Sequence, residues 1–228
     1  LLADGLATIR EDSPSRIVLI GTAEYGGLGG LSKLVIPKDD NIILTLHYYN
    51  PFQFTHQGAE WSEGADAWLG TEWNDTETDR QMVNTDFAAL KAFEIAQNIP
   101  IHIGEFGAYS KADKASRERW TTYMARYIEL QNWSWAYWEF SAGFGIYNPK
   151  TGSYNQYLLD ALLNNALPEP AKYVGTPVYT SNFNQNIAEW NLMAYNGAVA
   201  KKQHNSNNLL IQISAAGTQS WHLQLAKT

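Results

Sequence analysis

The 228-residue sequence contains no cysteine. This absence excludes disulfide bonds, thiol catalysis and thiolate metal sites, but it does not locate the protein, since many exported bacterial enzymes also lack cysteine. Basic residues are few, with 16 Lys and Arg against 23 Asp and Glu and a net charge of -7. The longest basic run is Lys201-Lys202, which does not offset the repulsion from a phosphate backbone. We therefore expect no nucleic-acid partner.

Long apolar runs are also missing. No run approaches the roughly 20 residues that cross a bilayer, and the opening Leu1-Leu2-Ala3-Asp4 lacks the basic and hydrophobic regions of a signal peptide. We expect no membrane contact, and we expect any export signal to lie outside this sequence. Because no set of metal ligands is legible either, the sequence predicts neither a metal ion nor another cofactor.

Apolar and aromatic residues are abundant. Hydrophobic residues make up 45% of the chain and charged residues 17%, which is the composition of a globular protein with a buried core. Nine Trp and thirteen Tyr are present. Flat aromatic faces pack in cores and also stack on the C–H faces of sugars, so this surplus is consistent with carbohydrate binding without establishing it.

The first two-thirds of the chain alternates short β-branched runs with amphipathic stretches, a pattern typical of parallel strands joined by helices. Each run stays apolar until its C-terminal end, where polar or ionisable residues follow, as in a (β/α) barrel or a doubly wound sheet. The predicted strands are residues 17–20, 42–47, 101–104 and 135–140. The predicted helices are residues 1–10, 79–98, 116–131 and 158–167.

The character of the sequence changes at Pro168-Glu169-Pro170. Residues 169–177 are rich in proline and glycine and are predicted to be a linker between a first domain, residues 1–168, and a second, residues 178–228. The second domain has short alternating strands, predicted at 209–214 and 221–225, but it is too short for a typical sandwich of about 100 residues. Because the first domain begins inside a helix, we also expect a segment to precede residue 1.

The strand Ile101-His102-Ile103-Gly104-Glu105 delivers a carboxylate to its C-terminal end between two glycines. A retaining glycosidase needs such a group, because an ionised carboxylate held below the anomeric carbon can attack it and form a glycosyl-enzyme intermediate. The alternative is that Glu105 is a surface residue paired with a lysine.

Two other strand ends carry candidate residues. His47 and Tyr49 should point to the same side of their strand, where Tyr49 could hydrogen-bond the carboxylate of Glu105. Trp138, near the end of the last predicted strand, is suited to the floor of a sugar-binding subsite. The alternatives are a structural histidine for His47 and core packing for Trp138.

Taken in order and spacing, His47-Tyr48-Tyr49, Gly104-Glu105-Phe106-Gly107 and Tyr137-Trp138-Glu139-Phe140 resemble the endoglucanases of glycoside hydrolase family 5. The loops at residues 54–61 and 143–147 resemble one branch of that family. The resemblance covers about residues 1 to 165 and implies strands five to eight of an eight-stranded TIM barrel. It implies the following roles: Glu105 as nucleophile, Tyr49 as the residue that orients it, His47 as a further catalytic residue, and Trp138, Trp61 and His56 as substrate-binding residues. For Trp61, packing within its loop is an equal alternative.

The resemblance also implies a general acid/base glutamate within an Asn-Glu pair, and no such pair occurs in this sequence. Glu24 lies on a different strand-end loop, and Glu60 and Glu139 belong to local patterns of their own, so none of the three is assigned this role. We expect the acid/base upstream of residue 1. A half-barrel would leave two open strand edges, which favours self-association.

From residue 178 the sequence resembles the opening strands of jelly-roll carbohydrate-binding modules, which implies a partial all-β sandwich. Trp190 and Trp221 are more plausibly core residues than sugar platforms.

The sequence thus predicts a retaining endo-β-1,4-glucanase acting on β-glucan polysaccharide or oligosaccharide. The alternative is a non-catalytic carbohydrate-binding fragment. Because polymeric glucans do not enter cells, the resemblance also implies an extracellular or cell-surface location.

Overall fold

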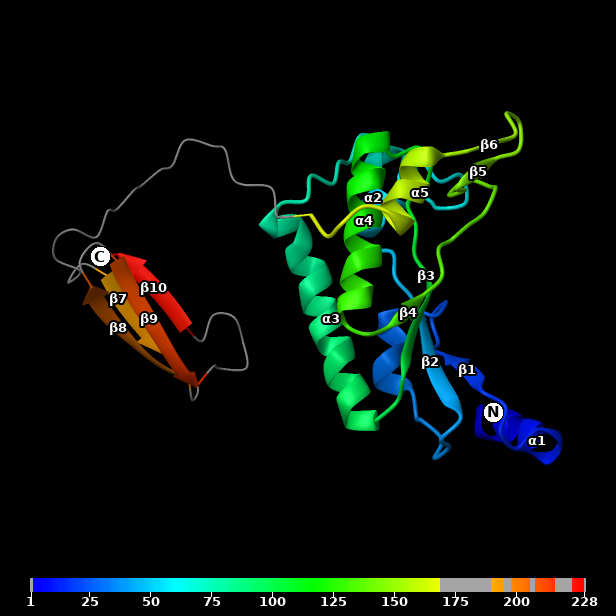
Figure 1. Ribbon diagram of the computed structural model, residues 1–228, viewed down its shortest axis with the longest axis horizontal. Coiled ribbons are helices and arrows are strands. Elements are labelled where there is room, and N and C mark those ends of the chain that lie inside the picture. Colours follow the sequence, from blue (N-terminus) through cyan, green and yellow to red (C-terminus); the bar gives the residue numbers. More distant parts are fainter. Residues whose placement is uncertain (1, 169–189, 195–197, 206–207, 216–222, 228) are drawn as a thin grey trace. The chain divides into compact units, whose positions relative to one another are not determined.

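The computed structural model describes residues 2–168, 190–194, 198–205, 208–215 and 223–227 (Figure 1). The chain divides into two compact units, Leu1–Tyr173 and Val174–Thr228. The predicted linker at 169–177 and the side chains of Trp190 and Trp221 lie outside the described part, so the predictions about them remain predictions.

The first unit is built on a parallel sheet of four strands in the order β1-β2-β3-β4. Its strands are β1 (Val18–Gly21), β2 (Ile42–His47), β3 (Ile101–Glu105) and β4 (Ser134–Trp135). Parallel neighbours with helical connections confirm the predicted α/β class. The two outer strands, β1 and β4, are the edges at which self-association is predicted.

Four helices of the first unit match the predicted helical segments: α1 (Leu2–Asp12), α3 (Glu77–Gln97), α4 (Lys114–Leu130) and α5 (Gln156–Leu163). Helix α3 begins at a capping box, in which Thr76 and Asp79 each accept a hydrogen bond from the other's backbone N–H. Asp113 caps α4 by accepting from the backbone N–H of Ser116. In the described part of the chain, no helix is long and apolar enough to cross a membrane.

The hydrophobic core lies between the sheet and helices α3 and α4, which run side by side along one face of the sheet (Figure 1). Alternate residues of β2 and β3 point into this core, as the two-residue period of a strand requires. The core residues include Leu44, Leu46, Ile101 and Ile103 from the sheet, Val83, Phe87 and Leu90 from α3, and Trp120, Met124 and Ile128 from α4. The opposite face of the sheet carries His47 and is less covered, with Leu19 of β1 52% exposed.

The last predicted strand, residues 135–140, is wrong in its length, because regular pairing ends at Trp135. Beyond that point the backbone still follows β3, since Ala136 N–H donates to Ile103 O and Trp138 N–H donates to Phe106 O, both at 2.9 Å. The Trp138-Glu139 peptide bond is cis. Short elements absent from the prediction are η1 (Leu28–Lys33), α2 (Phe52–Thr55), η2 (Ala65–Trp68), β5 (Tyr147–Asn148) and β6 (Ser153–Tyr154).

The second unit consists of antiparallel strand pairs in its described part. β7 (Trp190–Ala194) pairs with β10 (Leu223–Lys227), and β8 (Val199–Asn205) pairs with β9 (Asn208–Ala215). β9 and β10 overlap the predicted strands 209–214 and 221–225, and β7 and β8 lie outside those two ranges. A jelly-roll sandwich remains a prediction.

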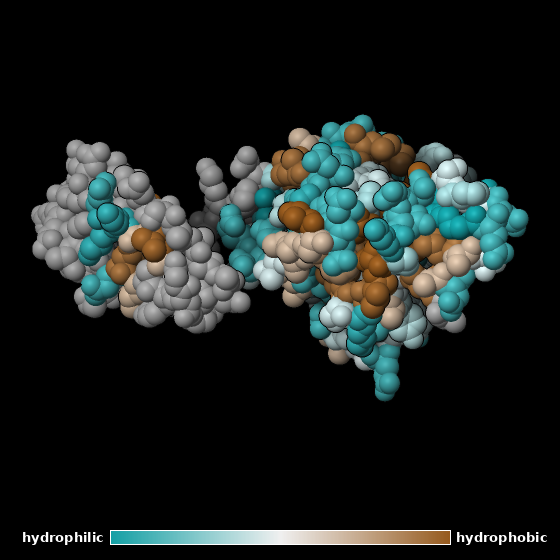
Figure 2. Space-filling view, turned by 90° about the horizontal axis from the view of Figure 1, so that it is seen from below, coloured by the Kyte–Doolittle hydropathy of each residue, from teal (hydrophilic) through white to brown (hydrophobic). Residues whose placement is uncertain are grey.

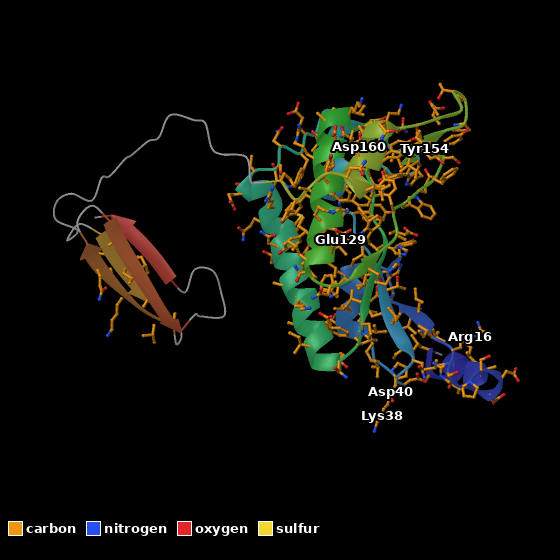
Figure 3. The ribbon with its side chains drawn as sticks, in the orientation of Figure 1. Arg16, Lys38, Asp40, Glu129, Tyr154 and Asp160 are labelled. Atoms are coloured by element: carbon orange, nitrogen blue, oxygen red, sulfur yellow. The ribbon has the colours of Figure 1, made fainter. Side chains whose placement is uncertain are left out.

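The two ends of the parallel sheet differ in character. Figure 3 places Lys38 and Asp40 at the end where the strands begin, and Tyr154 toward the opposite end, where they finish. A cavity of about 900 Å³ opens at the first end, between the start of β2 and the start of β3. Figure 2, which views the molecule from below, shows hydrophobic surface among hydrophilic side chains. The predicted catalytic residues lie at the other end, where β2 and β3 finish.

Candidate active site

Glu105 owes its direction to an irregularity in the sheet. Leu46 of β2 pairs with Ile103 of β3, but the next residue, His47, pairs with Glu105, so Gly104 is an extra residue in β3. Regular alternation would have sent Glu105 to the same side as the buried Ile103, whereas the extra residue turns it to the side of His47. A side chain at position 104 would collide with Thr45 Oγ1 unless Thr45 turned away, so glycine fits this bulge without displacing its neighbour.

Two side chains converge on one oxygen of Glu105. Tyr49 Oη donates to Glu105 Oε2 at 3.0 Å, and His47 Nδ1 lies 3.2 Å from the same oxygen. Burial is the main cause, and the nearby Glu105 carboxylate the second, of a pKa of Tyr49 far above its ordinary value. The Tyr49 hydroxyl therefore remains a donor. The Glu105 side chain is 24% exposed. The site therefore presents an accessible, hydrogen-bonded carboxylate at the end of a buried strand.

The loop that follows β2 holds Tyr49 from behind. Thr55 Oγ1 donates to Tyr49 O at 2.6 Å. The Tyr49 ring also makes edge contacts with His56 and Phe144, with centroids 5.0 and 6.0 Å away. Since the backbone and the ring are both held, the hydroxyl of Tyr49 has little freedom to leave Glu105.

Two predicted sugar-binding tryptophans are exposed. Trp138 is 45% exposed and Trp61 is 62% exposed. Trp61 packs edge-on against Tyr109, with ring centroids 4.9 Å apart, and tilts against Phe144 at 6.2 Å. An exposed indole supported in this way can offer a face to a sugar ring, but packing within the loop is also visible, so both interpretations of Trp61 stand.

His56 is the least exposed of the predicted site residues, at 8%. It stacks on Phe52 with ring centroids 4.0 Å apart, and its Nδ1 lies 2.9 Å from Thr55 Oγ1. Burial lowers the pKa of His56 from 6.5 to about 4. The ring is therefore neutral at physiological pH and packs against Tyr49, and direct substrate contact by His56 remains a prediction.

The stability of the first unit should depend on the titration of His56. The unfolded chain binds a proton at His56 near pH 6.5, but the folded chain does so only near pH 4. Stability from this residue is therefore complete above pH 6.5 and is lost progressively as pH falls toward 4, by up to about 3 kcal/mol. Urea unfolding across this pH range should show a steeper fall for the wild type than for His56→Gln. If the stability of the two proteins fell equally with pH, the lowered pKa of His56 would be contradicted.

The three other carboxylates considered for acid/base chemistry are held in other interactions. Glu24 pairs with Lys33 at 2.5 Å, and Glu60 accepts from Tyr109 Oη at 2.6 Å. Glu139 accepts backbone N–H groups of Ser141, Ala142 and Phe144. These contacts give Glu139 the role of fastening the loop that follows Trp138. The structure thus offers physical reasons for leaving all three out of the acid/base role.

Metal ligands do not gather at this site. Within the described residues, no group of three or more His, Cys, Asp or Glu side chains could hold a metal ion.

Sequence reasoning missed several residues that form the frame of the site, including Tyr109, Phe144 and Arg117. Arg117 could have been found, because it continues the buried stripe of Trp120 and Met124 toward the start of α4 at helical spacing. A charged residue in such a stripe signals a specific buried partner. Phe144 and Tyr109 lie in loops, where no periodicity marks a buried ring.

Comparisons with known proteins identify the family of the first unit. Residues 3–143 match the family described as Cellulase (glycosyl hydrolase family 5). Endoglucanase H of Acetivibrio thermocellus is 32% identical over 166 residues, which cover 70% of this chain and 17% of that protein. The structure of Thermotoga maritima Cel5A in complex with cellobiose is 46% identical, has a TM-score of 0.69, and matches 72% of this chain and 53% of that chain. Cel5A in complex with mannotriose gives the same identity and TM-score over 71% of this chain. This chain therefore spans about half the length of these solved structures.

Proposed function

The chain belongs to the cellulases of glycosyl hydrolase family 5, and from this premise we propose that it carries the nucleophile half of a retaining endo-β-1,4-glucanase. The carboxylate of Glu105 attacks the anomeric carbon of a β-linked sugar, the bond to the leaving oxygen breaks, and a glycosyl-enzyme intermediate forms. Water then hydrolyses this intermediate, with overall retention of configuration.

One observation carries the proposal: Tyr49 Oη and His47 Nδ1 meet on Glu105 Oε2 at 3.0 and 3.2 Å. A donor to one oxygen orients the carboxylate and leaves the other oxygen available for attack. A simple sugar-binding surface has no need of a carboxylate held in this way. The exposed Trp138 and Trp61 are proposed to stack on sugar rings on either side of the reacting bond.

The proposal assigns the general acid/base to a glutamate on a strand that precedes residue 1. The four strands of the first unit would then be strands five to eight of a TIM barrel, which agrees with the chain spanning 53% of the length of Cel5A. In a retaining glycosidase the two carboxyl groups lie about 5–5.5 Å apart. The acid/base would therefore face Glu105 across the open side of the sheet.

The proposed substrate is a β-1,4-linked glucan chain or oligosaccharide. The cellobiose bound to Cel5A supports a glucan, and the mannotriose bound to the same protein supports a site that also admits the C2 epimer of glucose. A polymer of this kind would be met outside the cytoplasm, so we propose an extracellular or cell-surface location.

The decisive experiment is to trap the intermediate on the 228-residue chain with 2,4-dinitrophenyl 2-deoxy-2-fluoro-β-cellobioside. The dinitrophenolate leaves without a proton, so the reagent tests the nucleophile whether or not an acid/base is present. The fluorine at C2 slows the hydrolysis of the intermediate, which lets the labelled protein accumulate. We expect one fluorocellobiosyl group, found by peptide mass mapping on Glu105.

A folded wild-type chain that takes up no label would overturn catalysis by this chain. If the same sample still bound cellotetraose in calorimetry, the alternative of a non-catalytic carbohydrate-binding fragment would replace the proposal.

A further inference from the structure

Arg117 is a buried cation with no carboxylate partner among the described residues. It lies in α4 and is 5% exposed, and no ion pair of the described part includes it. Its Nε donates to Ala108 O at 3.0 Å, one terminal nitrogen donates to Phe144 O at 3.2 Å, and the other donates to Tyr157 Oη at 2.5 Å. Burying a charge without a counter-ion is costly, so these three acceptors must be held firmly around the guanidinium.

Two of the three acceptors belong to the loops that carry predicted catalytic and subsite residues. Ala108 lies three residues after Glu105, and Phe144 lies in the loop that follows Trp138. The two loops also touch directly, because Trp138 N–H donates to Phe106 O at 2.9 Å. Arg117 therefore holds two loops against α4: the loop that follows Glu105 and the loop that follows Trp138.

Phe144 also links Arg117 to Glu105 through Tyr49. Its carbonyl is held twice, by Arg117 and by Tyr137 Oη, the latter at 2.9 Å. Its ring contacts the Tyr49 ring at a centroid distance of 6.0 Å, and Tyr49 Oη donates to Glu105 at 3.0 Å. Arg117 is thus connected to Glu105 in two ways. One is the backbone between Ala108 and Glu105, and the other is the contact of the Phe144 ring with the Tyr49 ring.

We propose that Arg117 is a positioning residue for the proposed reaction: its guanidinium sets the distance and angle between Glu105 and the sugar held at Trp138. The inference rests on the proposed function, because it assigns Arg117 to the formation of the glycosyl-enzyme intermediate. Arg117 touches neither the sugar nor Glu105, so its loss should slow bond formation and leave the initial binding of sugar nearly unchanged. A misplacement of about 1 Å at a reacting centre costs on the order of 10²-fold in rate.

Arg119 provides a matched control on the same helix. It donates through Nε to Trp73 O at 2.9 Å, and through a terminal nitrogen to Asn74 Oδ1 and Ser116 Oγ at 3.2 and 3.0 Å. It therefore has the same number of hydrogen-bonded partners as Arg117 but ties α4 to the segment before α3. Its loss should lower stability without changing the geometry around Glu105.

The test measures the inactivation of the full chain by the fluorocellobioside for the wild type, Arg117→Ala, Arg117→Lys and Arg119→Ala. Saturation curves separate the limiting inactivation rate from the half-saturating concentration, and near-UV circular dichroism reports folding. For Arg117→Ala we expect the limiting rate to fall on the order of 10²-fold, with the half-saturating concentration within about threefold of wild type. Millimolar guanidinium chloride should restore part of the rate by filling the space left by the side chain, whereas sodium chloride should not.

Arg117→Lys keeps the charge and most of the volume, so it gives a result even if the alanine variant does not fold. A single ammonium cannot reach the three acceptors together, and we expect a slower limiting rate than wild type at the same half-saturating concentration. Wild-type limiting rates in folded Arg117 variants, or an equal loss in Arg119→Ala, would overturn the inference while leaving the proposed function intact. An unlabelled wild type would overturn the proposed function itself, and with it the role of Arg117 in that reaction.

Discussion

Replacing Glu105 by glutamine should lower the release of dinitrophenolate from 2,4-dinitrophenyl β-cellobioside by at least about a thousandfold and abolish labelling by the fluorosugar. The amide has nearly the shape of the carboxylate, and its oxygen can still accept the hydrogen bond from Tyr49. It carries no charge, however, and it does not attack an anomeric carbon. The loss should therefore appear in bond formation and not in folding, which thermal unfolding of both proteins would check.

A smaller residue at the same position tests the geometry of attack. Glu105→Ala leaves a space below the anomeric carbon of 2,4-dinitrophenyl β-cellobioside. Azide, a small anionic nucleophile, should attack that carbon from this face, displace dinitrophenolate and give an α-glycosyl azide. Glu77→Gln, an exposed change in the first turn of α3, serves as the matched carboxylate control and should react like the wild type. A Glu105→Gln protein that still takes up the fluorosugar, or an azide product of β configuration, would exclude Glu105 as the nucleophile.

The position of Glu105 at a strand end could be predicted from sequence, but its direction could not. The apolar run before Glu105 marks a buried strand, and the strand period alone would align Glu105 with Ile101 and Ile103, toward the helices. The extra residue at Gly104 reverses this direction. A pattern of hydrophobicity does not distinguish a glycine in a regular strand from a glycine in a bulge. The pairing of Glu105 with His47 depends on contacts with β2, which the local sequence does not show.

The contact between Tyr49 and Glu105 was predicted from the two-residue strand period and from the family resemblance, and the structure contains this hydrogen bond. The segment around Trp138 was less predictable. Its aromatic and β-favouring residues indicate a strand to residue 140, yet pairing with β3 ends at Trp135. The carboxylate of Glu139 instead accepts hydrogen bonds from three backbone N–H groups of the next loop. This local side-chain-to-backbone bonding competes with the pairing of a strand.

Buried charges were the features that sequence reasoning missed most completely. Composition and periodicity treat arginine as a surface residue, whereas Arg117 and Arg80 are 5% and 6% exposed. Each is stable only because particular acceptors surround it: main-chain carbonyls and a phenol for Arg117, and the carboxylate of Asp75 for Arg80. Such partners come from distant segments or from turns of unusual backbone, and Asp75 itself has a φ of 60°.

Arg80 gives the largest expected effect on stability. Its Nε and one terminal nitrogen donate to the two carboxylate oxygens of Asp75 at 2.5 and 2.8 Å. The same terminal nitrogen donates to Pro168 O at 2.7 Å, and the guanidinium lies 4.5 Å from the centre of the Tyr123 ring. Arg80→Gln would leave Asp75 buried and unpaired, so we expect a loss of about 3–5 kcal/mol in the free energy of unfolding. Urea unfolding followed by near-UV circular dichroism would measure it.

Two comparisons separate the effect of burial from that of the ion pair itself. Lys33 and Glu24 are also 2.5 Å apart, but their side chains are 69% and 50% exposed, so Lys33→Gln should leave the urea midpoint unchanged within error. Asparagine tolerates the positive φ of position 75, and Asp75→Asn combined with Arg80→Gln removes both charges. This double variant should be more stable than Arg80→Gln alone, because the unpaired buried charge and not the missing attraction carries most of the cost. If the double variant were the less stable of the two, Asp75 would have to be stabilised by contacts other than Arg80.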